Sequence, residues 1–429
     1  MTKRPFFTFL KPGFYYDLVE PQPEEPESIP LPDNLILLLN EPINSAKKSL
    51  IKKGDSVKKG EKLYLYDDST EYTISPVTGS ISSIDIYLDD FGNTSTYLVI
   101  EKDQNETVDT ITYDLKDDIA SADNYLRTLP GGPPLKTLAS SDNKINTIVI
   151  TCIDTDLLAT TSQYVASKFS NEIKEGAQIL KKLTNAQKLC IAVPEESGLK
   201  EKFDSTEVFE TSIRYPSNSP ALILKEHLNI TLPAGKAPED VGVCFVSAEA
   251  AASLARAYQT KTAGFEKYLT IIGKEGNKQR VKASIGTSLG KIFKALDIHI
   301  GNEDRIVIGC PMQGIATYTL SHPVQPDMDT IIIQDKNIIP QLSDNACINC
   351  GKCVQICPAN IPVNILVRYL EADKYEEAAD RYDLESCIGC GLCAYVCIAK
   401  IPLYQYIKLG KHELSALRES SVELETANE

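Results

Sequence analysis

The chain has 429 residues and 42% hydrophobic side chains, which is enough for about two to four domains with cores of their own. Its formal net charge of −15, from 59 acidic and 44 basic residues, excludes nucleic acid as an expected partner and disfavours direct binding to an anionic membrane. No apolar run approaches the roughly 18 residues of a transmembrane helix, and no export signal is evident, so the sequence predicts a cytoplasmic protein.

The first third of the chain predicts an extended arm followed by a small β-domain. Residues 1–35 are rich in Pro and Glu and cannot form a core, so we expect an arm that lies on the next domain, with a mobile tail as the alternative. Residues 36–115 predict short strands with hairpin turns, as in the barrel-sandwich hybrid fold of lipoyl carrier domains. The expected tip, residues 67–72, contains no Lys that could carry a lipoyl group, which indicates a structural copy of that fold.

Residues 116–262 predict a Rossmann-like α/β domain. Strand-like runs at 146–153, 188–194 and 241–247 alternate with amphipathic helical segments, and this alternation is typical of a parallel sheet. Three cysteines fall inside these runs and are interpreted as small buried hydrophobes: Cys152, Cys190 and Cys244.

Residues 263–335 return to a strand-rich pattern with one helix, and we predict a small β-grasp domain of the SLBB type. Cys310 follows its last strand-like run before a Pro-Met-Gln-Gly segment. A packing role is the expected one for this cysteine, and lining a pocket is the alternative.

Residues 336–418 carry two cysteine runs that are internal repeats, each cysteine lying 40 residues after its counterpart (387 − 347 = 40). Both runs have the C-x₂-C-x₂-C-x₃-C spacing of two-cluster ferredoxins, in which the fourth Cys ligates the other cluster. The spacing therefore predicts two [4Fe–4S] clusters. The first is held by Cys347, Cys350, Cys353 and Cys397, and the second by Cys387, Cys390, Cys393 and Cys357.

Structural zinc and disulfides are weaker interpretations of these runs. Zinc ribbons use separated C-x₂-C pairs, and disulfides need an oxidising compartment. The second run departs from the pattern, with Ile398 where the first has Pro358, and this change could loosen the turn without removing a ligand. Helical spacing between the runs predicts a helical ferredoxin module, followed by a polar tail at 419–429. The fold class is multidomain α/β.

In this order, the predicted parts resemble the C subunit of Rnf-type electron-transport complexes. The resemblance is strongest in the two cysteine runs and in the ISPVTGSISSI segment, and it extends over nearly the whole chain. It implies an FMN and NADH site in the Rossmann-like domain, electron exit through the two clusters, and membrane-embedded partner subunits. It further implies a peripheral position on the inner face of the cytoplasmic membrane.

Four segments depart from that family's flavin and nucleotide patterns. The glycine-rich flavin loop becomes LPGGPPLKTL, which keeps Gly131 and Gly132 but surrounds them with prolines that supply no N–H group to a phosphate. An acidic pattern after the first strand retains Asp154 and Asp156. The family's Tyr-Pro-x-Gly-Gly and Asn-Val-(Glu or Gly)-Thr patterns become YPSNSP and SAEAA.

The leading hypothesis is an iron–sulfur electron-transfer subunit that has lost NADH oxidation and receives electrons from a soluble or peripheral donor protein. One alternative is an FMN-containing, NADH-oxidising subunit of the Rnf or cobalamin reductase type, with a divergent flavin site. Another is a scaffold whose clusters are structural. The basic residues Arg368, Lys400, Lys408 and Lys411 flank the clusters and suggest a docking face, or ordinary solvated charges.

Overall fold

The structure is a computed structural model that describes residues 13–44, 46–89, 91–105, 107, 118–140, 144–203 and 206–426. The chain forms two compact units. The sheet unit comprises Tyr16–Ile213 and Pro238–Ile338. The cysteine unit comprises Met1–Tyr15, Arg214–Ala237 and Ile339–Glu429. The first 12 residues of the predicted arm, the predicted boundary at 115/116 and the last three residues of the predicted tail lie outside the described residues.

The first layer of the sheet unit is antiparallel, with strand order β2-β7-β6-β3. Its strands are β2 (Asn34–Leu39), β3 (Ser56–Val57), β6 (Gly79–Leu88) and β7 (Thr94–Lys102), and a separate pair is formed by β4 (Lys62–Leu63) and β5 (Thr73–Ile74). Burial alternates along β7, because successive side chains of a strand point to opposite faces. Its buried residues Leu98 and Ile100 pack with Leu35 and Leu37 of β2 in one core.

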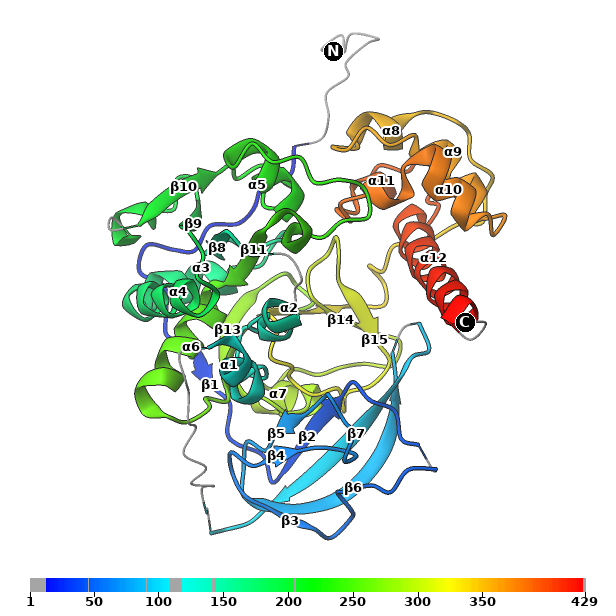
Figure 1. The fold of residues 1–429 in the computed structure, drawn as a ribbon. Helices are drawn as coiled ribbons and strands as arrows, with labels where there is room; N and C mark the ends of the chain where they lie inside the picture. The colour runs from blue at the N-terminus through cyan, green and yellow to red at the C-terminus, as the bar shows by residue number, and fades with distance from the viewer. Residues whose placement is uncertain are drawn as a thin grey trace. The chain divides into compact units, whose positions relative to one another are not determined.

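A second, fully parallel sheet has the order β10-β9-β8-β11 (Figure 1). Its strands are β8 (Thr147–Thr151), β9 (Lys188–Pro194), β10 (Glu207–Thr211) and β11 (Val243–Ser247). The accompanying helices are α1 (Ile119–Leu126), α2 (Leu135–Ser140), α3 (Thr161–Lys168), α4 (Ser170–Thr184) and α6 (Ala248–Thr260), with short 3₁₀ turns at Lys200–Phe203 and Pro238–Val241. A Cβ on Gly176 of α4 would lie 1.8 Å from the carbonyl oxygen of Ala251, so only glycine allows α4 and α6 to pack this closely.

The cysteines predicted in the core of this region are buried. Cys152 and Cys244 belong to its hydrophobic core, and Cys190 lies on the buried strand β9. Burial raises the pKa of Cys190 to about 11 and that of Cys244 to about 12, so both thiols stay protonated at neutral pH.

The third sheet is mixed and has the order β1-β13-β12-β16-β14-β15. It contains β1 (Glu27–Ser28), β12 (Glu266–Ile272), β13 (Lys278–Ser284), β14 (Arg305–Ile308), β15 (Ile315–Thr317) and β16 (Thr330–Gln334), with the helix α7 (Leu289–Ala295). The described part of the N-terminal arm thus adds an edge strand, β1, to a sheet built from residues more than two hundred positions later. Cys310 is also buried, and it lines a pocket of this unit.

The cysteine unit is helical. Its elements are α5 (Pro220–His227), α8 (Lys352–Ile356), α9 (Val363–Leu370), α10 (Tyr375–Tyr382), a 3₁₀ turn at Leu384–Ser386, α11 (Leu392–Tyr395) and α12 (Leu403–Thr426) (Figure 1). A Cβ on Gly410 of α12 would lie 2.6 Å from a methyl group of Leu370, so α12 packs on α9 at this glycine. In the described ranges, no helix is both long and apolar enough to cross a membrane.

Two features of this unit differ from the sequence-based expectation. Residues Arg214–Ala237, predicted inside the 116–262 domain, belong to the cysteine unit. The helix α12 runs to Thr426, through most of the predicted 419–429 tail. The sequence pattern reveals neither feature. A polar helix and a polar tail have similar compositions, and hydrophobic periodicity does not indicate which unit a segment joins.

Candidate iron–sulfur site

The two cysteine runs fold into the same local structure. Six residues, paired 40 positions apart, have positive φ angles between 55° and 73°: Asn349 and Gly389, Gly351 and Gly391, and Asn360 and Lys400. Gly351 and Gly391 stand at the N-caps of the short helices α8 and α11, where a left-handed backbone favours glycine. The repeat seen in the sequence is therefore also a repeat of backbone conformation.

The departure at Ile398 does not alter the turn that follows each run. The N–H group of Asn360 donates to the Cys357 carbonyl at 3.3 Å, and that of Lys400 donates to the Cys397 carbonyl at 3.2 Å. The sequence leaves open whether Ile398 loosens this turn. In the structure, the turn after the second run has the same hydrogen bond as the turn after the first.

One small pocket gathers the predicted ligands of the first cluster. It is lined by Cys347, Cys350, Cys353 and Cys397, so the fourth cysteine of the second run lies at the pocket of the first. The other four thiols influence one another electrostatically: Cys357, Cys387, Cys390 and Cys393. Four thiols at each position are the donor set of a [4Fe–4S] cluster, so these residues could hold two clusters.

Several thiols of the two groups are poorer acids than a free cysteine. Burial raises the pKa of both Cys353 and Cys390 to about 11, and it also raises the pKa of Cys393. Because thiolates are the ligands of iron, cluster assembly releases these protons. Among the described residues, no three His, Cys, Asp or Glu side chains are arranged to hold a single metal ion.

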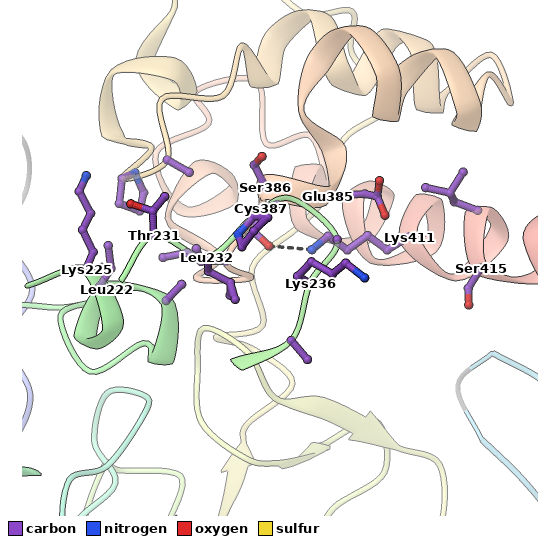
Figure 2. A pocket seen from close by; sticks show the side chains of 18 of the residues that line it. Leu222, Lys225, Thr231, Leu232, Lys236, Glu385, Ser386, Cys387, Lys411 and Ser415 are labelled. Atoms are coloured by element: carbon purple, nitrogen blue, oxygen red, sulfur yellow. Dashed lines mark hydrogen bonds between the residues drawn. The ribbon is translucent and has the colours of Figure 1, made fainter. Parts of the chain in front are cut away.

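Side chains from outside the run hold the loop of the second cysteine run. The hydroxyl of Tyr215, from the inserted segment 214–237, donates to the carbonyl of Cys390 at 2.6 Å. The ammonium group of Lys411 on α12 donates to the carbonyl of Cys387 at 2.7 Å, as the dashed line in Figure 2 shows. A Cβ on Gly235 would lie 2.6 Å from a carboxylate oxygen of Glu385, so this part of the inserted segment also packs on the loop.

The sequence does not identify Tyr215 as a residue of the cysteine site. Its Tyr-Pro pair stands out only as part of an altered nucleotide pattern, and nothing in the sequence signals the contact with Cys390. The two runs differ here, because Cys390 is buried whereas its counterpart Cys350 is exposed.

Replacing Tyr215 with Phe is expected to lower the free energy of unfolding by about 1–2 kcal/mol, because the Cys390 carbonyl loses its side-chain donor in a buried position. Urea unfolding measures the change. Tyr375→Phe is the matched control, since that hydroxyl donates at 2.8 Å to Asp373 at an exposed position, and its loss should change little. Equal effects of the two variants would contradict the role of Tyr215.

The remnant flavin loop leaves no free amide for a phosphate at its two glycines. The N–H group of Gly131 donates to the Pro326 carbonyl at 2.7 Å, and that of Gly132 donates to the Leu129 carbonyl at 3.0 Å. A Cβ on Gly131 would lie 2.1 Å from the backbone nitrogen of Ala250, so the loop packs directly on the start of α6. With prolines in the neighbouring positions, these residues do not fit an anion cradle.

Asp154 and Asp156 are both tied into the protein by hydrogen bonds. Asp154 accepts from the Ser162 N–H at 2.9 Å and from the Gln163 side chain at 2.9 Å. Asp156 accepts from three backbone N–H groups, those of Leu157, Met312 and Gln313. Burial raises the pKa of each carboxyl to about 6.

The pocket that these two aspartates line is unsuited to a dinucleotide. Gly132 lines a neighbouring pocket that shares Gln325 and Asp327 with it, so the glycine and the two aspartates do not line the same pocket. The aspartate pocket has a volume of about 440 Å³ and no Lys or Arg in its described lining, which includes Asp89, Asp154, Asp156, Asp327 and Asp329. Its His322 is neutral, because burial lowers its pKa to about 4. These carboxylates would repel the phosphates of NADH or FMN.

Comparisons with known proteins agree with these two regions. Residues 21–105 match the family described as RnfC barrel sandwich hybrid domain, and residues 346–401 match the 4Fe-4S dicluster domain. The chain is 26% identical to the C subunit of a proton-translocating ferredoxin:NAD(+) oxidoreductase complex of Clostridium ljungdahlii, over 92% of this chain and 91% of the relative.

Two further relatives have similar names. The C subunit of a Na(+)-translocating ferredoxin:NAD(+) oxidoreductase complex of Acetobacterium woodii is 23% identical over 78% of this chain and 81% of its own length. The C subunit of an ion-translocating oxidoreductase complex of Vibrio cholerae is 26% identical over 82% of this chain, which spans 48% of that relative's length.

The fold and the cysteine site define an iron–sulfur protein that joins an N-terminal barrel-sandwich hybrid domain to a C-terminal 4Fe-4S dicluster domain. The chain is a divergent relative of the C subunits of Rnf-type ion-translocating oxidoreductase complexes.

Proposed function

We propose that this chain relays single electrons through two [4Fe–4S] clusters within a membrane-associated, Rnf-like complex and does not itself oxidise NADH. Each cluster would be held by three cysteines of one run and the fourth cysteine of the other. The observation that carries the proposal is the contrast between the two candidate sites: all eight ligand cysteines are present in one helical unit, whereas the glycine amides of the flavin loop are engaged by the protein's own carbonyls.

The domain assignments support this division of roles. We interpret the parallel sheet as a Rossmann-like domain with a degenerate nucleotide site, and the mixed sheet as a β-grasp domain of the SLBB type. Both domains would then have a structural role and no catalytic one. By likeness to the relatives, the partners are the other subunits of an Rnf-type complex, and the chain would be peripheral on the inner face of the cytoplasmic membrane. An electron donor protein takes the place of NADH.

Purified, cluster-reconstituted protein tests the proposal. We expect no flavin absorption band and no bleaching of the cluster absorbance by NADH, while dithionite produces the EPR signals of reduced [4Fe–4S] clusters. A related C subunit with an intact glycine-rich loop, measured alongside, is the positive control. A flavin band with NADH-dependent bleaching would overturn the loss of NADH oxidation, and clusters that dithionite leaves unreduced would favour the structural scaffold.

A further inference from the structure

A large pocket lies beside the second cysteine run, entirely within the cysteine unit. Its volume is about 760 Å³, and its walls come from α5, the loop after it, the end of the first run at Pro358 and Ala359, the loop of the second run and α12. Figure 2 shows Cys387 in this wall, with Lys225, Lys236 and Lys411 around the same pocket. Because Cys387 itself lines the pocket, the pocket adjoins the position proposed for a cluster.

The pocket carries an excess of positive charge. Its lining has four basic residues, Lys225, Lys236, Lys411 and Arg418, and two acidic ones, Glu385 and Glu419. Arg418 and Glu385 neutralise each other through hydrogen bonds of 2.7 and 3.1 Å. Within the described part of the chain, the exposed ammonium groups of Lys225 and Lys236 have no ion-pair partner, so their charges are available to a ligand.

This local charge is opposite to that of the molecule. With a net charge of −15, the chain repels an acidic macromolecule over most of its surface and attracts it only where cations gather. Such a contrast orients a transient partner, because electrostatic complementarity controls the encounter rate and the register more than the final affinity. The lysines come from three separate elements, and Lys225 and Lys236 are exposed, an arrangement that suits a protein surface better than a small anion, which needs buried, converging donors.

We propose that this pocket is the docking site of an acidic electron-carrier protein, with surface carboxylates around its redox centre. One electron leaves the reduced centre of the carrier and enters the cluster that includes Cys387; the carrier is oxidised by one electron and the cluster is reduced by one, with no proton or bond exchanged. This proposal rests on the proposed relay function and adds the place at which electrons enter. The basic residues predicted as one docking face therefore belong to two different pockets. Lys411 lines this pocket, and Arg368 lines the pocket of Cys347, Cys350, Cys353 and Cys397.

Stopped-flow reduction of the full, cluster-reconstituted chain by a reduced acidic bacterial ferredoxin tests the site. At low ionic strength, Lys225→Glu/Lys236→Glu should lower the second-order rate constant by about tenfold or more, and should weaken its dependence on salt. The matched control is Lys374→Glu/Arg381→Glu, which makes the same charge change at exposed positions of the same unit outside both pockets. Its rate constant should stay within about twofold of the unmodified chain's.

Two other measurements separate the possible failures. Dithionite reduction with EPR is run on every variant, because unreduced clusters in the unmodified chain would defeat the relay function itself. If dithionite reduces all variants equally but the Lys225→Glu/Lys236→Glu variant reacts with the carrier as fast as the unmodified chain, the docking proposal is wrong while the relay survives. A rate loss confined to Lys352→Glu/Arg368→Glu would likewise overturn it and move the docking site to the other cluster.

Discussion

The double variant Cys347→Ser/Cys397→Ser is expected to retain roughly half of the bound iron, whereas Cys347→Ser/Cys357→Ser should lose nearly all of it. The first pair removes two ligands from one cluster, because Cys397 lines the same pocket as Cys347. The second pair removes one ligand from each cluster, although both of its cysteines belong to the same run. The variants remove the same number of thiols, so each is the control of the other.

Iron analysis and EPR after reconstitution measure this difference. The cross-ligated arrangement predicts one intact [4Fe–4S] signal in the Cys347→Ser/Cys397→Ser variant. If each run instead held its own cluster, the outcomes would be reversed, and the variant with changes in a single run would keep the intact signal. Equal loss in both variants would indicate that neither cluster assembles without the other.

Replacing Lys267 with Met is expected to lower the free energy of unfolding of the sheet unit by about 3–5 kcal/mol. The Lys267 side chain is fully buried, and its ammonium group bonds the Glu249 carboxylate and, at 2.8 Å, the Asp329 carboxylate. Burial alone would lower the pKa of Lys267, but Asp329 and Glu249 raise it above its ordinary value, so the side chain is charged. Methionine has a similar shape and leaves the buried Glu249 carboxylate without its cation.

Urea unfolding, with hydrogen exchange along β12 as a local probe, measures the loss. The matched control is Lys282→Met on the neighbouring strand β13, where the 3.1 Å pair with Glu266 is partly exposed and its loss should cost less than about 1 kcal/mol. The further change Glu249→Gln in the Lys267→Met background should restore part of the stability, because it removes the unpaired charge. A Lys267→Met variant as stable as the control would show that the buried ion pair makes no net contribution to the free energy of unfolding.

The cysteine runs illustrate what local sequence patterns predict well. A fixed spacing of ligands and glycines specifies a short loop, and the structure repeats each left-handed residue of the first run 40 positions later. Similarly, apolar runs such as Lys188–Pro194 predict a buried strand with its observed bounds, since burial of adjacent side chains is a local property.

The flavin segments illustrate what local patterns leave open. The sequence indicates that these segments are altered, but their present roles depend on distant partners. Gly131 is needed because it meets Ala250, and Asp156 holds backbone groups more than one hundred and fifty residues away. No periodicity encodes such pairs, so their function as packing and hydrogen-bonding residues emerges only in three dimensions.

The sequence by itself determined the iron–sulfur chemistry, since ligand type and spacing lie within short stretches that fold locally. Only the tertiary structure decided which residues from other parts of the chain contact the cysteine runs. Residues 214–237 belong to the cysteine unit and not to their predicted domain, and Tyr215 donates a hydrogen bond to the Cys390 carbonyl. The tertiary structure also gathers Lys225, Lys236 and Lys411 from separate elements around Cys387. The physical reason is that hydrogen bonds and close charge pairs act over a few ångströms. Residues far apart in the sequence can lie within that distance, and the sequence alone does not indicate which ones do.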